Sequence, residues 1–135
     1  MYRVLVVDDE PEIARSLRRV LRGAYEVEIE SSANEALAKL DVSCPDIIIS
    51  DFRMPEMNGA KLLSEVHRRL PSSIRLLLSG LAELDLEVLS EHAGSVSRFL
   101  KKPWRNDELL EVLAELLEAR ARCEPGEAAL VELQR

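Results

Sequence analysis

The chain has 135 residues, of which 47% are hydrophobic and 32% charged, a balance typical of one globular domain and too apolar for a disordered chain. Its formal net charge of −7 argues against a nucleic-acid-binding role, because such proteins usually present a basic surface. We expect a cytoplasmic, reduced protein with no membrane segment, since the sequence shows no secretion signal, no apolar run near the roughly 20 residues of a membrane span, and two cysteines without metal-ligand spacing.

Short runs of Val, Ile and Leu recur along the chain and indicate strands. Continuous apolar runs of this length suit strands that are buried on both faces, as in a parallel sheet. The run at 27–29 is the weakest of them. We expect strands at residues 4–7, 27–29, 47–49, 76–78 and 96–100.

Segments with helical spacing lie between and after these strands. Pro11 suits the first turn of a helix, and Gly23 suits the end of the same helix. Pro71 would close the third helix, and Asn106 or Asp107 is the expected N-cap of the last. The fourth segment is less regular than the others, because its apolar residues partly alternate. We expect helices at residues 13–21, 36–40, 62–70, 84–92 and 109–117.

The alternation of strands and helices predicts a doubly wound α/β fold with helices on both faces of a parallel sheet. In such folds ligands bind at the carboxyl edge of the strands. After about residue 119 the pattern weakens, and residues 120–135 are expected to form a tail, a helix extension or a linker.

Polar residues follow four of the predicted strands. Asp8 and Asp9 come after the first strand, Asp51 after the third, Ser79 after the fourth and Lys102 after the fifth. These side chains would converge on one edge of the sheet. Carboxylates so close together repel each other, and they must take up a proton or bind a cation. Hard oxygen ligands suit Mg²⁺, and the lysine adds a charge suited to phosphate.

Several catalytic arrangements are missing from the sequence. It contains no Gly-rich loop of the kinds that hold nucleotides. His67 and His92 fall inside predicted helices, away from the strand ends, and Ser79 has no neighbouring base that would make it a nucleophile. The remaining acceptor for a phosphoryl group is a carboxylate, and Asp51, at the centre of the sheet, is the best candidate.

Four motifs in order resemble the receiver domain of two-component response regulators. They are VLVVDDE, IIISDFRMPEMNG, RLLLSG and RFLKKPW, and the resemblance extends from residue 2 to about 119. It implies a flavodoxin-like, five-stranded parallel sheet, (βα)5, with strand order 2-1-3-4-5. The receiver domain would occupy residues 1–119.

The resemblance assigns roles to the acidic residues. Asp51 corresponds to the phosphoacceptor, which takes a phosphoryl group from a sensor histidine kinase or a histidine phosphotransfer protein. Asp8 and Asp9 correspond to the acidic pair that binds Mg²⁺, or Mn²⁺, with Asp51. Arg53 occupies the position whose backbone carbonyl completes the metal site. The domain would catalyse only its own phosphorylation and dephosphorylation.

The resemblance also assigns a phosphate ligand and a switch. Lys102 matches the phosphate-binding lysine, before a peptide bond to Pro103 that is usually cis in the family. Ser79 matches the hydroxyl switch residue and Phe99 the aromatic one. Phosphorylation would change the face formed by the fourth helix, fifth strand and fifth helix, which is also the expected homodimer surface. The domain itself would bind neither nucleic acid nor membrane.

Two alternatives stay open at this stage. The first is a degenerate receiver that acts only as a binding module. The second is a Mg²⁺-dependent phosphohydrolase of the haloacid-dehalogenase type, which also uses an aspartate at a strand end. Those enzymes carry a second aspartate two residues later, where this sequence has Arg53.

Overall fold

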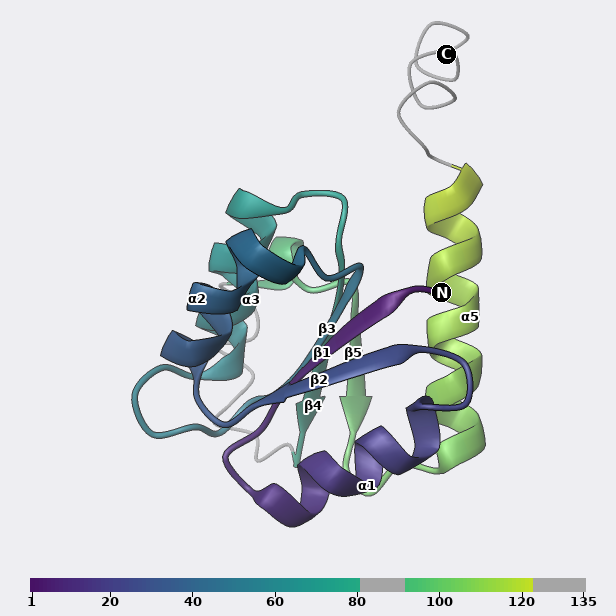
Figure 1. Cartoon of the computed structure of the whole chain (residues 1–135), viewed down its shortest axis with the longest axis horizontal. Helices are drawn as coiled ribbons and strands as arrows, with labels where there is room; N and C mark the ends of the chain where they lie inside the picture. The colour runs from purple at the N-terminus through teal and green to yellow at the C-terminus, as the bar shows by residue number, and fades with distance from the viewer. Residues whose placement is uncertain (81–91, 123–135) are drawn as a thin grey trace, which may run out of the picture. The chain divides into compact units, whose positions relative to one another are not determined.

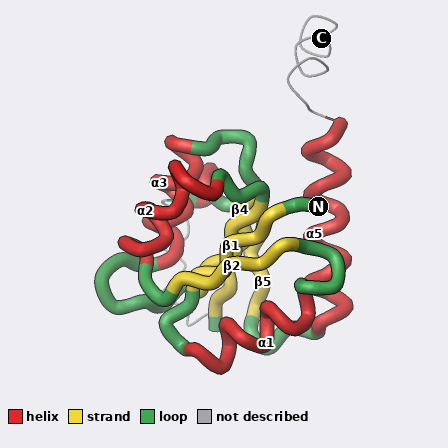
Figure 2. Tube along the Cα trace, in the orientation of Figure 1, coloured by secondary structure: helices red, strands yellow, loops and turns green. Residues whose placement is uncertain are grey.

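The computed structural model describes residues 1–80 and 92–122, shown as a cartoon in Figure 1 and as a tube in Figure 2. The chain divides into two compact units, Met1–Trp104 and Arg105–Arg135. Helices and a 3-10 turn alternate with the strands. In chain order the elements are β1 (Arg3–Val7), α1 (Pro11–Leu21), β2 (Glu26–Glu30), α2 (Ala33–Ser43), β3 (Ile47–Asp51), α3 (Gly59–Arg69), β4 (Ile74–Ser79), η1 (Ala93–Ser95), β5 (Arg98–Lys101) and α5 (Asn106–Arg122).

The five strands form one parallel sheet in the order β2-β1-β3-β4-β5. This confirms the predicted doubly wound fold and strand order. The first unit has α2 and α3 together on one face of the sheet and α1 on the other (Figure 1). Because all the strands run the same way, their carboxyl ends lie along one edge.

The core is built from the strands in the middle of the sheet. Every residue of β3 and β4 is buried, whereas β2, at the edge, is only partly buried. Aliphatic side chains from β1, β3 and β4 pack against α2 and α3, with partly buried Met54 and Met57 closing the cluster. Among the described residues, Tyr25 and Phe52 are the only aromatic members of the core, which is otherwise aliphatic.

Local sequence explains where the first three helices begin. Pro11 is in the first turn of α1, where its missing N–H costs nothing. Ser32 caps α2 by accepting a hydrogen bond from the Glu35 N–H, at 3.1 Å. Asn58 caps α3 in the same way, with 2.8 Å from its Oδ1 to the Lys61 nitrogen. Both caps satisfy N–H groups that have no partner inside the helix.

Three predictions near the carboxyl end of the chain need correction. The strand expected from residue 96 begins at Arg98, because the Arg75 N–H of β4 donates to the Ser97 hydroxyl and the pairing with β4 starts only at Arg98. His92 lies in a turn rather than in a helix. Asn106 is already the first residue of α5 and not its N-cap. The helix predicted at 84–92 lies almost wholly outside the described residues.

The second unit is represented by α5 alone. Its first turn carries Asp107 and Glu108, and its last turn carries Arg120 and Arg122. This charge distribution complements the helix dipole at both ends. Across residues 1–80 and 92–122, no helix has the length and apolar character needed to cross a membrane.

Candidate functional site

The carboxyl edge of the sheet brings the predicted polar residues together. Asp8 directly follows β1, Asp51 is the last residue of β3, and Ser79 is the last residue of β4. Lys102 follows β5, and its backbone N–H donates to the Ser79 carbonyl at 2.8 Å. The parallel register of the strands therefore explains why residues from four distant parts of the sequence meet here.

Three carboxyl groups form an acidic cluster at this edge. Oxygen atoms of Asp8, Asp9 and Asp51 all lie within 4.8 Å of one another. Asp8 and Asp51 are buried, whereas Asp9 is exposed. Asp8 Oδ1 accepts a hydrogen bond from the Glu10 N–H at 2.9 Å. Within the described parts of the chain, Asp8 Oδ2 is the one buried side-chain polar atom without a hydrogen-bond partner.

This environment disfavours the charged form of Asp8. Burial raises the pKa of its carboxyl group to about 6, partly offset by the Glu10 N–H, and the negative charges of Asp51 and Asp9 add to the increase. Lys102 acts in the opposite direction. A buried carboxylate with one unpartnered oxygen, close to two other carboxylates, fits a divalent cation with oxygen ligands. The residues present therefore suit Mg²⁺.

A lysine lies against the buried aspartate of β3. Lys102 Nζ is 2.5 Å from Asp51 Oδ1, and the two form an ion pair in which Asp51 is buried and Lys102 is partly exposed. The bond between Lys102 and Pro103 is cis, as the resemblance implied. The ammonium group therefore stands where it can contact any anion carried by Asp51.

The other predicted residues lie in different environments. Ser79 is almost fully buried at the end of β4, beside Lys101 of β5 in the strand register. Phe99 pairs with Leu77 and is 38% exposed, so it is not part of the core. Arg53 is exposed, two residues after Asp51.

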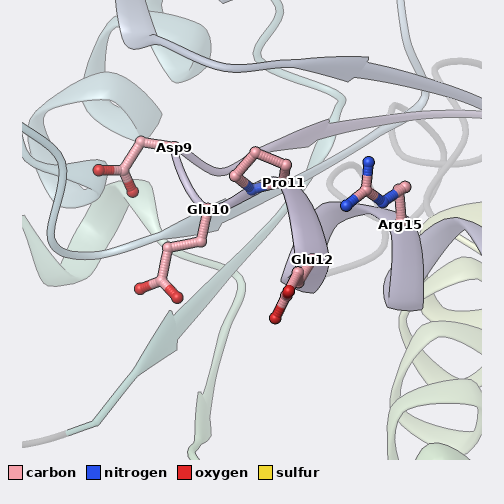
Figure 3. Close-up of a pocket in the computed structure, with 5 residues that line it drawn as sticks. All are labelled: Asp9, Glu10, Pro11, Glu12 and Arg15. Carbon is pink, nitrogen blue, oxygen red and sulfur yellow. The ribbon is translucent and has the colours of Figure 1, made fainter.

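A depression lies beside the acidic cluster at the start of α1 (Figure 3). Asp9, Glu10, Pro11, Glu12 and Arg15 line it. In the close-up the carboxylates of Asp9 and Glu10 extend to the same side, while Arg15 stands further along the helix. The approach to the cluster is therefore predominantly acidic, which is suited to attracting cations.

The sequence patterns assigned no role to Ser50 and Gly59, which lie next to the backbone carbonyl of Asp51. The Ser50 hydroxyl donates to the backbone carbonyl of Asp51 at 2.9 Å. A Cβ atom on Gly59 would lie 2.1 Å from that same carbonyl oxygen and 2.8 Å from Ser50 Oγ. The only sequence signal was that both residues fall inside the quoted motif around Asp51.

A doubly wound sheet with carboxylates and a lysine at its carboxyl edge defines a flavodoxin-like α/β domain with a candidate metal site. The family model "Response regulator receiver domain" matches residues 4–114. The chain therefore belongs to the response regulator receiver domain family.

Individual relatives agree with this membership. The chain is 34% identical over 117 residues to the hydrogenase transcriptional regulatory protein HoxA of Cupriavidus necator, covering 87% of this chain but 24% of that protein. The chain thus spans about a quarter of the length of the curated regulator. A CheY-like receiver domain protein from Methanospirillum hungatei superimposes with a TM-score of 0.84 at 32% identity, covering 92% of this chain and 99% of that one.

One solved relative bears on the candidate metal site. The response regulator TrrA of Thermotoga maritima, in complex with Mg²⁺ and BeF, has a TM-score of 0.76 and 30% identity, covering 86% of this chain and 99% of that one. Receiver domains of this family bind Mg²⁺ at an acidic pocket, and this chain has an acidic cluster at the carboxyl edge of its sheet.

Proposed function

We propose that this receiver domain accepts a phosphoryl group on Asp51. The observation that carries the proposal is the arrangement around that carboxylate. Lys102 Nζ lies 2.5 Å from one of its oxygens, and carboxylate oxygens of Asp8 and Asp9 lie within 4.8 Å of it. A cation site and a fixed ammonium on either side of one carboxylate suit a group that becomes an aspartyl phosphate.

The donor is a phosphohistidine of a sensor histidine kinase or of a histidine phosphotransfer protein. An Asp51 oxygen forms a bond to phosphorus while the phosphorus–nitrogen bond breaks. The electron pair of that bond stays on the histidine nitrogen, which takes up a proton. Lys102 is placed to offset negative charge on the phosphoryl oxygens during transfer and in the product.

The acidic cluster supplies the metal ligands. Asp8, Asp9 and Asp51, together with the backbone carbonyl of Arg53, would hold Mg²⁺ or Mn²⁺, which when bound offsets charge on the transferred group. The Glu10 N–H donates to Asp8 Oδ1, and the buried Oδ2 is left without a hydrogen-bond partner. The side chain of Arg53 is exposed two residues from Asp51, where it can shield the acyl phosphate from water.

Phosphorylation then acts through a switch. The hydroxyl of Ser79, buried at the end of β4, moves to the new phosphate oxygens, and Phe99 turns inward from its exposed position. By the family resemblance, the elements affected are the fourth helix, β5 and α5, which are also the proposed homodimer elements. The fourth helix lies outside the described residues.

We also propose that the domain is cytoplasmic, with residues 1–119 as the receiver and residues 120–135 as a linker or helix extension. Its output would come from a partner or from a longer regulator, as in HoxA, of which the chain matches 24%. The phosphohydrolase alternative is not favoured. Arg53 stands where those enzymes need an acid, and the family match identifies a signalling domain.

The test is phosphorylation by a small donor. The purified protein is incubated with acetyl phosphate and Mg²⁺, and its intact mass is measured. We expect one phosphoryl group on the wild type and none on Asp51→Asn or after chelation of the metal. A wild type that gains no mass, or an Asp51→Asn variant that gains it equally, would show that the assignment of Asp51 is wrong.

A further inference from the structure

Asp51 lies at the point where β3 no longer pairs with β1 but still pairs with β4. On the β1 side the last pair in the register is Val7 with Ser50. On the β4 side the pairing continues to Asp51 with Leu78. The phosphoacceptor is thus paired with β4 but lies past the end of its pairing with β1.

The peptide unit that joins Asp51 to Phe52 is nevertheless held at both polar ends. The Phe52 N–H donates to the Leu78 carbonyl at 2.8 Å. At the other end, the Ser50 hydroxyl donates to the Asp51 carbonyl at 2.9 Å, and the Ser50 side chain is completely buried. Buried, satisfied hydrogen bonds of this kind restrict rotation of the peptide plane.

The first residue of α3, Gly59, packs closely against the Asp51 carbonyl. A Cβ atom on Gly59 would lie 2.1 Å from the Asp51 carbonyl oxygen and 2.8 Å from both Ser50 Oγ and a methyl group of Leu77. The Gly59 N–H also donates to the Phe52 carbonyl at 2.8 Å. The carbonyl and the hydroxyl that contacts it are therefore packed against the helix backbone.

We propose that Ser50 is a positioning residue for phosphorylation. Its hydroxyl fixes the Asp51 carbonyl, and through the peptide plane it sets the direction in which the Asp51 carboxylate projects toward Lys102 and the acidic cluster. Small displacements of a reacting group are costly in rate, because transfer requires in-line geometry. This inference rests on the proposed function of Asp51 as phosphoacceptor.

The hydrogen bond can be observed directly. Asp51–Phe52 is the only Asp–Phe pair in the sequence. Labelling with carbonyl-¹³C aspartate and ¹⁵N phenylalanine therefore gives a single carbonyl–amide correlation in an NMR spectrum, and it reports the Asp51 carbonyl. Removing the hydroxyl in Ser50→Ala should move this carbon signal upfield, since the carbonyl loses a hydrogen-bond donor.

Kinetics then test whether the bond positions the carboxylate. At saturating Mg²⁺ and well below the unfolding temperature, we expect Ser50→Ala to be phosphorylated by acetyl phosphate about tenfold more slowly than the wild type. Ser50→Thr keeps the hydroxyl and is expected to keep both the carbon signal and the rate.

A matched control separates positioning from stability. Ser43 is also buried, and its hydroxyl donates to the Lys39 carbonyl at 3.0 Å in the last turn of α2. It lies near Arg3, at the opposite end of β1 from Asp8. Ser43→Ala should leave the phosphorylation rate and the Asp51 carbon signal unchanged, even where it lowers the unfolding temperature as much as Ser50→Ala does.

The proposal requires that the rate follow the carbonyl signal across these variants. It is overturned if Ser50→Ala leaves the signal in place, if the signal moves and the rate does not, or if Ser43→Ala slows the reaction equally. A wild type that is not phosphorylated would instead refute the proposed function, while the carbon signal would still report whether the Ser50 bond exists.

Discussion

At the residue scale, burial of the Asp8 carboxylate lowers the stability of the metal-free protein. Its Oδ2 is buried without a partner, and burial raises the pKa of the carboxyl from 3.8 to about 6. At a pH between these two pKa values, the folded state therefore keeps a proton on Asp8 that the unfolded chain has lost. The contribution of Asp8 to stability therefore falls as pH rises from about 4 to about 6.

Asp8→Asn should remove this penalty. An amide can still accept the Glu10 N–H, and it carries no charge to be desolvated. We expect the metal-free variant to be more stable than the wild type at neutral pH by about 3 kcal/mol. The free energy of unfolding is measured in urea with a chelator at several pH values. The difference should vanish below about pH 4, and a variant less stable than the wild type at neutral pH would contradict the prediction.

Gly59 illustrates a constraint of a different kind. Its missing side chain makes room for the Asp51 carbonyl, which a Cβ would approach to 2.1 Å, and the obstructing atom is backbone that cannot rotate away. Gly59→Ala should therefore destabilise the protein by about 2 kcal/mol or more.

Gly23 provides the matched control for this change. Nothing lies within 4 Å of a Cβ built there, and the backbone does not have positive φ. Gly23→Ala should leave stability unchanged or raise it by up to about 1 kcal/mol. Urea unfolding followed by circular dichroism compares the two variants. Equal effects would mean that the close approach at Gly59 is unimportant.

At the scale of elements, one buried arginine connects the segments that precede β4 and β5. Arg75 Nε donates to the Ser95 carbonyl of η1 at 2.6 Å, and Nη1 donates to the Ser73 carbonyl at 2.7 Å and to the Pro71 carbonyl at 3.3 Å. Burial lowers the pKa of its guanidinium. The charge is thus compensated by backbone dipoles that two different turns direct at it.

Arg75→Ala should be strongly destabilising, by about 2–4 kcal/mol, because it removes a buried side chain together with its hydrogen bonds to three backbone carbonyls. Arg68, which is exposed and lies 2.6 Å from Glu65, is the comparison. Arg68→Ala should hardly change the unfolding midpoint, since exposed ion pairs contribute little. Chemical denaturation of both variants is the measurement. Similar losses of stability in the two variants would show that burial is not the reason for the contribution of Arg75 to stability.

The same elements show how far sequence patterns predict this fold. Apolar runs identified all five strands, but β2 was detected weakly because an edge strand is partly exposed and alternates with glutamates. β4 was predicted too short, since the apolar pattern stops at Arg75, which is nevertheless buried. Helix 36–40 proved to be Ala33–Ser43, because its first turn depends on the Ser32 cap rather than on apolar spacing.

At the scale of the whole molecule, the order of elements explains why the site residues could be predicted and their support could not. Parallel strands bring their carboxyl ends to one edge, so residues that follow strands are expected to meet. The Ser50 bond and the Gly59 contact depend on the exact distance between β3 and α3, which no periodicity in the sequence encodes. The unpartnered Asp8 oxygen depends in the same way on local packing.

Binding of Mg²⁺ should therefore stabilise the whole domain. A cation that binds only the folded state adds about 2.7 kcal/mol at a concentration 100 times its dissociation constant. It also relieves the repulsion among three carboxylates that lie within 4.8 Å of one another. We expect the unfolding temperature to rise with Mg²⁺ concentration near pH 7.5.

The dependence of this stabilisation on pH identifies the residue responsible. Because the pKa of Asp8 is about 6 in the folded protein, protons compete with the metal below that value, and the rise in unfolding temperature should be largely lost at about pH 5. Asp8→Asn should show little rise at either pH, although it starts from a more stable metal-free state. A full Mg²⁺ response in this variant would place the cation away from Asp8, whereas a response that persists in the wild type at about pH 5 would mean that Asp8 is ionised in spite of its burial.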